Sequence, residues 1–321
     1  MGDDGGVTPS TGVVFPAGAD VATLPAFARS VEAWGFDELW VVEDCFMSGG
    51  LVMAASALAV TERLRVGVGL LPVPLRNPAL AAMEIATIAR LHPGRFTATF
   101  GHGVRAWMEQ VGAAPAHRLA ALREVVTAVR ALLAGETVSV RGRHVALTGV
   151  TLDAPPQPAP PVLIGTTGPR GLAVAGDVAD GVLIPEGCGP AFIAHTVAPV
   201  AAAAAAGRPF TTTVYAWLSI DDDDERARAR LRPALDHWLA LGLYPGPMAA
   251  AGIDPGRPAG EQPAGLADEV ALVGDAAACA AGVQRWAHAG AETVVLFPAG
   301  ADAEHQYARF AAEALPLLRA R

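Results

Sequence analysis

The turn Gly165-Thr166-Thr167-Gly168-Pro169 carries the clearest chemistry in this chain of 321 residues. Its glycines let the backbone approach a ligand, its threonines offer hydroxyl donors, and Pro169 suits the first position of a helix. The unpaired N–H groups and the dipole at a helix start favour an anion such as phosphate. The turn therefore predicts an anion site, and ordinary connection chemistry is the alternative.

Strand-like and helix-like segments alternate along the whole chain, and they must position this turn. Eight such strands over this length predict an α/β fold, a (β/α)8 TIM barrel formed by residues 1–321 as a single domain. An open doubly wound sheet is the competitor, but no GxGxxG motif follows the first strand. The expected strands are Val13–Pro16, Glu38–Val42, Leu64–Leu71, Phe96–Phe100, Val162–Ile164, Gly181–Ile184, Thr211–Ile220 and Thr293–Phe297. The expected helices are Leu24–Trp34, Leu51–Ala59, Ala79–Leu91, Leu119–Leu133, Arg170–Val178, Phe192–Ala206, Ala276–Ala289 and Glu304–Arg319.

Two stretches depart from this alternation. Residues 137–152 have the polar pattern of a hairpin between a helix and the next barrel strand. Residues 221–265 begin with the acidic run Asp221–Glu225, which suits a solvated helix start, and then become rich in proline and glycine from Tyr244 to Gly265. We interpret residues 221–265 as an inserted lid or edge excursion, with a disordered loop as the alternative.

Composition limits the classes of function. Hydrophobic residues make up 52% of the chain and charged residues 17%, which supplies a large core and argues against disorder. A net charge of −9 argues against a nucleic-acid partner, and no segment resembles a membrane span or an export signal. We therefore expect a cytoplasmic enzyme acting on a small molecule.

Lysine is absent, since all 23 basic residues are arginine, and this excludes lysine nucleophiles and lysine bases. The three cysteines, Cys45, Cys188 and Cys279, are far apart in the sequence, which predicts neither a disulfide framework nor a metal site.

In a barrel, functional groups gather where the strands end at the carboxyl edge. The second expected strand ends in Glu43-Asp44, the third leads to Arg76-Asn77-Pro78, and the fourth ends in Gly101-His102-Gly103. The fifth ends in the turn Gly165–Pro169 and the sixth in Pro185-Glu186.

These strand ends, with the segments LWVVED, RVGVGLLPVPLRNPALAAMEIATIARLHPGRFTATFGHG and ALVGDAAACAAGVQRWAHAGAETVVLFP, resemble the bacterial luciferase-like superfamily. The most similar subgroup is the F420-dependent reductases and dehydrogenases, which include methylenetetrahydromethanopterin reductase and glucose-6-phosphate dehydrogenase. The resemblance covers the chain and is weakest over residues 221–265. It implies coenzyme F420 as the cofactor, with FMN as the alternative, and a homodimer.

The resemblance also assigns cofactor-binding residues. Gly165, Thr166, Thr167, Gly168 and Pro169 match the family segment that holds the cofactor phosphate. Gly101 and Gly103 match a glycine-rich strand end near the side chain of the cofactor. Val68, Gly69 and Leu70 match a bulge that supports the flavin-like ring, and we place a cis peptide bond between Val68 and Gly69. Arg76 is a further candidate for cofactor contact, with a structural role as the alternative.

The same resemblance places Glu43 and Asp44 opposite the ring, where the family has an acidic or histidine residue. A partly buried carboxyl can keep its proton and deliver it beside a hydride transfer. His102 is the third candidate, because Val104 stands where several relatives carry a catalytic acid. The alternatives are helix capping for the carboxyls and loop hydrogen bonding for His102.

Three functions remain open at this point. The first is an F420-dependent reductase that moves hydride between the deazaflavin C5 and a C=C or C=N bond of a small or natural-product substrate. The second is a two-component monooxygenase that uses FMNH2 and O2, with a flavin reductase as its partner. The third is a non-catalytic flavin-binding protein.

Overall fold

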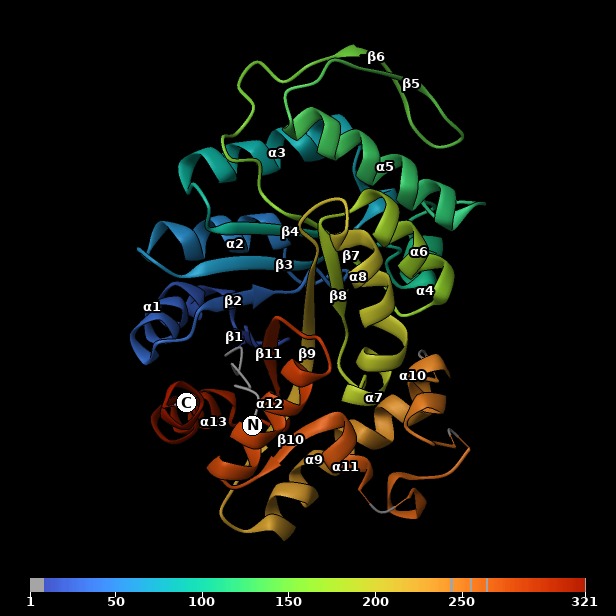
Figure 1. The fold of residues 1–321 in the computed structure, drawn as a ribbon. Helices are drawn as coiled ribbons and strands as arrows, with labels where there is room; N and C mark the ends of the chain where they lie inside the picture. Colours follow the sequence, from blue (N-terminus) through green and yellow to red (C-terminus); the bar gives the residue numbers. More distant parts are fainter. Residues whose placement is uncertain (1–8, 243–244, 255, 264, 321) are drawn as a thin grey trace.

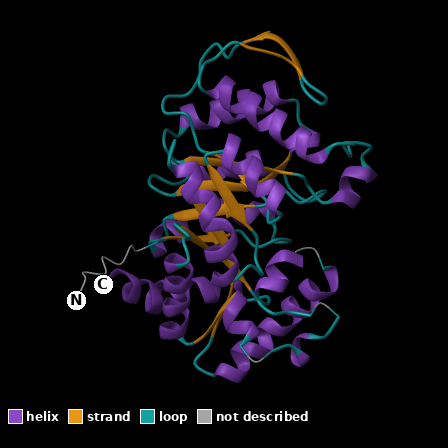
Figure 2. Cartoon of the chain, turned by 45° about the vertical axis from the view of Figure 1, so that its right-hand side comes forward, coloured by secondary structure: helices purple, strands orange, loops and turns teal. Residues whose placement is uncertain are grey.

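The computed structural model describes residues 9–242, 245–254, 256–263 and 265–320. Within these ranges, eight parallel strands form a closed barrel surrounded by helices, which confirms the predicted TIM barrel (Figures 1 and 2). The barrel closes because β8 pairs with β9. In spatial order its strands are β1 (Ser10–Val14), β2 (Glu38–Val41), β3 (Arg65–Pro72), β4 (Phe96–Gly101), β7 (Val162–Gly165), β8 (Gly181–Ile184), β9 (Thr211–Ile220) and β11 (Thr293–Pro298).

The predicted helices are present, and α1 has the predicted bounds, Leu24–Trp34. It ends at Gly35, whose positive φ of 86° suits glycine after a helix. Two expected single helices are each divided by a π-helical turn: 192–206 into α7 and α8, and 304–319 into α13 and α14. The helices are α2 (Gly50–Ala59), α3 (Pro78–Leu91), α4 (Arg105–Gln110), α5 (Arg118–Leu133), α6 (Pro169–Val178), α7 (Pro190–Phe192), α8 (Ala198–Ala205), α9 (Asp224–Leu241), α10 (Pro245–Ala250), α11 (Leu266–Val270), α12 (Ala276–His288), α13 (Ala303–Arg309) and α14 (Leu315–Arg319).

Two further strand features complete the sheets. The predicted hairpin is an antiparallel pair, β5 (Val138–Arg141) and β6 (Ala146–Val150), which stands away from the barrel beyond α3 and α5 (Figure 1). The strand β10 (Ala271–Gly274) was not predicted. It finds a partner because β9 is ten residues long: the first half of β9 pairs with β8 and its last residues pair with β10.

The interior of the barrel is filled by large side chains facing small ones. Trp40 lies against Gly67, where an added Cβ would be 2.5 Å from the indole ring. The edge of Tyr215 packs against Trp40 with ring centroids 5.8 Å apart. Leu163, Leu183 and Val295 complete this cluster. The floor of the barrel mouth is therefore a packed layer topped by the Tyr215 hydroxyl.

The described part of residues 221–265 is helical and has its own apolar core. Leu231, Leu235 and Met248 pack with Trp217 of β9 and Val270 of α11, so this excursion is ordered rather than a disordered loop. The predicted helix start is confirmed, because the Asp223 side chain accepts from the Arg226 amide at the beginning of α9. Tyr244, one bound of the proline-rich stretch, lies outside the described residues.

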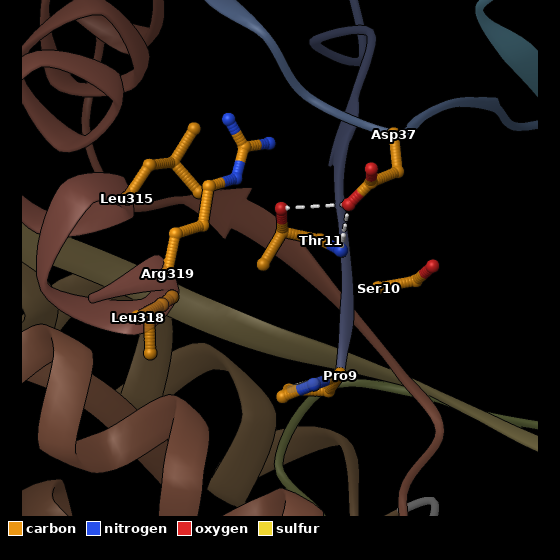
Figure 3. A pocket seen from close by; sticks show the side chains of 7 residues that line it. All are labelled: Pro9, Ser10, Thr11, Asp37, Leu315, Leu318 and Arg319. Atoms are coloured by element: carbon orange, nitrogen blue, oxygen red, sulfur yellow. Dashed lines mark hydrogen bonds between the residues drawn. The ribbon is translucent and has the colours of Figure 1, made fainter. Parts of the chain in front are cut away.

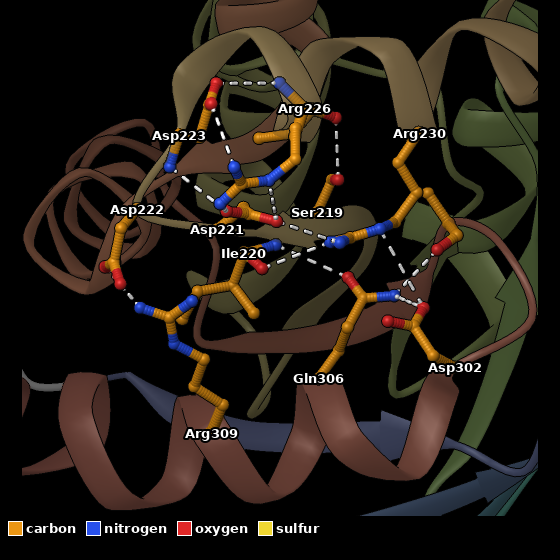
Figure 4. A network of polar contacts seen from close by, with 12 residues as sticks. Ser219, Ile220, Asp221, Asp222, Asp223, Arg226, Arg230, Asp302, Gln306 and Arg309 are labelled. Carbon is orange, nitrogen blue, oxygen red and sulfur yellow. Dashed lines mark hydrogen bonds and ion pairs between the residues drawn. The ribbon is translucent and has the colours of Figure 1, made fainter.

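A polar network ties the start of this excursion to the barrel (Figure 4). The Asp221 carboxylate accepts from Arg226 Nη2 at 2.7 Å and from Arg230 Nη2 at 3.0 Å. These hydrogen bonds with Arg226, together with its positive charge, lower the pKa of Asp221. Gln306 of α13 joins Ile220 and Ala299, so the network connects β9, α9 and the last helices.

Candidate functional site

The peptide bond between Gly69 and Leu70 is cis, one residue after the predicted position between Val68 and Gly69. The Val68 side chain faces α2, where a Cβ on Gly50 would lie 2.6 Å from it. Gly69 faces the barrel interior, where a Cβ would lie 2.3 Å from the Tyr215 hydroxyl. A second cis bond, which the sequence did not suggest, joins Cys45 to Phe46.

The Leu70 side chain explains two of the glycines at the mouth. A Cβ on either Gly101 or Gly165 would lie 2.5 Å from a Leu70 methyl carbon. Leu70 therefore occupies the space that these glycines leave at the ends of β4 and β7. Gly103 has a φ of +68°, which favours glycine where the chain turns away from β4.

The Glu43 carboxylate has two partners, the Arg76 side chain and the Gly50 amide. Its carboxylate pairs bidentately with the Arg76 guanidinium, and its Oε2 accepts from the Gly50 amide at 2.8 Å. Arg76 also lies 3.5 Å from Glu84. The side chains of Glu43 and Arg76 are 10% and 23% exposed. Both residues thus brace the start of α2 against the loop after β3, which is the geometry of positioning residues.

Asp44, in contrast, has no side-chain hydrogen bond or ion pair among the described contacts, and burial raises its pKa. The His102 Nδ1 atom is buried without a partner within the described part of the chain. Burial and the charge of Arg118 lower the pKa of His102 to about 4, so its imidazole is neutral at pH 7. His102 is accordingly a hydrogen-bonding group at neutral pH rather than an acid.

The predicted anion turn leads directly into α6. Gly168 is the N-cap residue, without a side-chain hydrogen bond, and Pro169 stands at the first helical position as expected. The amides of Arg170 and Gly171 therefore belong to the first turn of α6, where no carbonyl of the same helix can accept from them. A Cβ on Gly168 would meet nothing within 4 Å, whereas one on Gly171 would lie 2.1 Å from the Thr166 hydroxyl oxygen, so this helix start is open at Gly168 and flanked by Thr166.

Several neighbouring residues have structural roles. Asn77 caps α3 by accepting from the Ala79 amide. His117 directly precedes α5. Asp180 accepts from the Val162 amide and pairs with Arg130, which fixes the connection below the anion turn.

Two groups at the mouth were not among the site residues predicted from the sequence. Tyr215 lies inside the barrel, and its buried hydroxyl has no partner in the described ranges. Glu186 follows β8, and burial together with the charge of Asp44 raises its pKa. The signal for both was position: Glu186 ends a predicted strand, and Tyr215 occupies an inward position on another.

A surface hollow lies at the opposite end of the barrel (Figure 3). Its polar group, the Asp37 carboxylate, is already engaged by the amide and hydroxyl of Thr11, at 2.8 and 3.2 Å. The other lining residues are Pro9, Ser10, Leu315, Leu318 and Arg319. The carboxylate of this hollow is thus occupied, and its other polar side chains, Ser10 and Arg319, contact Arg65 and the Gly35 carbonyl.

Among the described residues, no group of three or more His, Cys, Asp or Glu side chains is arranged to hold a metal ion. No described helix combines the length and the apolar character needed to span a membrane. Burial and the nearby carboxylates raise the pKa of Cys45, which keeps its thiol protonated.

A parallel barrel with unpaired polar groups at its carboxyl edge defines the class as a TIM-barrel enzyme. The chain matches the family described as luciferase-like monooxygenase over residues 4–293, and it therefore belongs to that family. It is an oxidoreductase, as relatives and structures similar to it are.

Three of these similar proteins are informative. The F420-dependent glucose-6-phosphate dehydrogenase of Kineococcus radiotolerans is 29% identical over 92% of this chain and 93% of its own length. The 5,10-methylenetetrahydromethanopterin reductase of Methanolobus tindarius is 28% identical over 68% of each chain. The structure of coenzyme F420-dependent tetrahydromethanopterin reductase from Methanopyrus kandleri superimposes with a TM-score of 0.84 at 21% identity, covering 97% of this chain and 99% of that one.

Proposed function

We propose that this chain is a coenzyme F420-dependent reductase acting on a C=C or C=N bond of a small or natural-product substrate. The relatives named above support the cofactor class. The observation that carries the proposal is a line of unsatisfied groups along one edge: Asp44, the buried His102 Nδ1 and the open start of α6. Of these groups the His102 Nδ1 atom is buried, and because buried polar atoms normally have partners, a bound ligand would satisfy it.

The residues fit such a cofactor in three places. The amides of Arg170 and Gly171, with Thr166 and Thr167 beside them, would hold its phosphate. The Gly69–Leu70 peptide and the Leu70 side chain would form the wall behind its ring. Neutral His102, at the end of β4, would donate or accept a hydrogen bond with the cofactor. When bound, the deazaflavin supplies a hydride from C5.

The protein's own contribution is positioning and proton handling. The Glu43–Arg76 pair fixes the backbone that presents Asp44. Burial disfavours the charged form of Asp44, which prepares this carboxyl for proton exchange beside a hydride transfer. The packed layer of Trp40, Tyr215 and Leu183 closes the mouth from below and excludes water on that side.

Binding spectra with reduced F420 and with FMN, recorded side by side, test this proposal. We expect F420 to bind with a micromolar or lower Kd, and turnover without oxygen consumption. Tight FMN binding without F420 binding would contradict the proposal. Oxygen consumption with FMNH2 and a partner flavin reductase would then indicate a monooxygenase, and binding without turnover would indicate a non-catalytic flavin protein.

A further inference from the structure

Glu186 has no part in the function proposed above, and it lies at the mouth with Tyr215 and Asp44. Tyr215 belongs to β9, Glu186 follows β8 and Asp44 follows β2. In the closed barrel, three strands separate β2 from β8 in either direction, so Asp44 and Glu186 follow strands on opposite sides of the mouth. Tyr215 comes from β9 and reaches across to Gly69 of β3.

The Tyr215 side chain is fixed in place, and its hydroxyl lacks a hydrogen-bond partner among the described residues. The residue is 4% exposed and its ring is locked against Trp40. Its hydroxyl lies next to the Gly69–Leu70 peptide, and no hydrogen-bond partner for it occurs in residues 9–320 as far as they are described. A buried hydroxyl without a partner points to a group that binds above it.

Glu186 sits on a loop that is anchored from outside the barrel. A Cβ on Gly187 would lie 2.4 Å from Trp238 of α9, and one on Gly189 would lie 2.3 Å from Glu269 of α11. The Glu186 carboxyl has no cation within ion-pair distance among the described side chains, whereas Glu43 is fully paired. Glu186 is partly exposed, so a substrate in the mouth can reach it.

The surroundings of Glu186 favour its protonated form. The charge of Asp44 acts on Glu186, the charge of Glu186 acts on Tyr215 and Cys188, and Glu269 approaches the loop from α11. Burial raises the pKa of Glu186, and the charge of Asp44 raises it further. Burial and both carboxylates raise the pKa of Tyr215 well above its ordinary value. Glu186 therefore holds a proton more tightly than an exposed carboxyl does, and Tyr215 keeps its proton.

We propose that Glu186 is a catalytic residue that delivers the proton of this reaction, with Tyr215 and Asp44 as the groups that orient and retain that proton. This inference rests on the proposed function. The proton leaves a Glu186 carboxyl oxygen for one atom of the substrate double bond, and a carboxylate remains. The hydride from the reduced deazaflavin goes to the other atom, so one C=N or C=C bond becomes a single bond with two added hydrogens. Solvent then returns a proton to Glu186.

Infrared pH titration of the protein without cofactor tests the proton position directly. The C=O band of a protonated carboxyl should persist in wild type to a higher pH than in Glu186→Gln. Glu38→Gln is the matched control, because Glu38 lies in the same barrel but is paired with Arg65 and Trp40 at the other end. We expect Glu38→Gln to retain the band. An unchanged band in Glu186→Gln would overturn the proposal.

The Asp44→Asn variant tests the direction in which Asp44 shifts the pKa of Glu186. A merely structural role of Asp44 would not produce this shift. Removing the Asp44 charge takes away one cause of the raised Glu186 pKa. The remaining carboxyl band should therefore disappear at a lower pH in Asp44→Asn than in wild type. A band that disappears at the same or a higher pH would show that the two groups do not interact as proposed.

Kinetics then test whether this proton is used. Glu186→Gln should lower kcat by about 10²-fold or more, the usual contribution of a positioned acid, with the cofactor Kd unchanged. A wild-type kcat in this variant would exclude Glu186 as the donor. If wild type neither binds nor turns over F420, the proposed function fails, while the infrared result still decides whether Glu186 holds a proton.

Discussion

The two ends of the barrel differ in how the carboxyls and hydroxyls named here are paired. At the amino end, Glu38 is bound by Arg65 and Trp40, and Asp37 by Thr11. At the carboxyl end, Asp44 and the Tyr215 hydroxyl have no such partners among the described residues. The surface hollow of Figure 3 belongs to the amino end. Unpaired carboxyls, rather than open space, therefore mark the functional end.

Among the variants that test this difference, Asp44→Asn should have the largest effect. Asparagine keeps the size of the side chain but removes the charge that helps to keep the proton on Glu186, so turnover should fall by about 10²- to 10³-fold, which corresponds to about 3–4 kcal/mol in the activation barrier. Thermal unfolding should change little, because Asp44 has no partner to lose. Steady-state kinetics and calorimetry measure the two effects, and retained turnover would show that Asp44 has no part in proton handling.

Gly168→Asp separates anion binding from helix stability. Aspartate is a favourable N-cap residue, and its Cβ has open space, so the helix should be at least as stable as in wild type. Its carboxylate would compete for the same amides and repel a phosphate, which should weaken cofactor binding about tenfold or more, or at least about 1.4 kcal/mol. Gly168→Ser is the neutral control, and equal binding by both variants would argue against a phosphate at α6.

Asp37→Asn is the counterpart of the Asp44 variant at the amino end. Loss of the charged acceptor for the Thr11 amide should lower the free energy of unfolding by about 1–2 kcal/mol. Turnover should stay at the wild-type value because the strand ends of the mouth are not touched. Denaturant titration measures the free energy of unfolding, and steady-state kinetics measure the turnover. A large loss of turnover would contradict the difference between the two ends.

The smallest effect concerns pH. Because the folded-state pKa of Asp221 is lowered, its contribution to stability is present above the unfolded-state pKa and is lost as the pH falls through the folded-state value. Asp221→Asn should cost only about 1 kcal/mol at pH 7, since the Arg226 side chain is 65% exposed and solvent screens the pair. The difference from wild type should shrink below about pH 4. Urea titrations at several pH values measure this difference in the free energy of unfolding. A difference that grows as the pH falls would contradict the prediction.

Local patterns predicted much of this protein. The bounds of α1 follow from its apolar spacing and from Gly35, and the α6 start follows from Gly168-Pro169. The strand β10 was missed because it is an addition to the eight strands of the barrel, and its pairing with the last residues of β9 is a contact between distant parts of the chain. The cis bond was misplaced by one residue because the packing of Leu70 against Gly101 and Gly165 involves three separate strands.

The sequence by itself determined the barrel, its family resemblance and the open amides of the Gly165–Pro169 turn, because these depend on residues that are neighbours in the chain. Only the tertiary structure distinguished Glu43 from Asp44. Arg76, 33 residues away from Glu43, pairs with it, whereas Asp44 has no such cation among the described residues and its charge acts on Glu186 across the mouth. Pairing and burial depend on distances through space, and these decide which carboxyl can hold a proton.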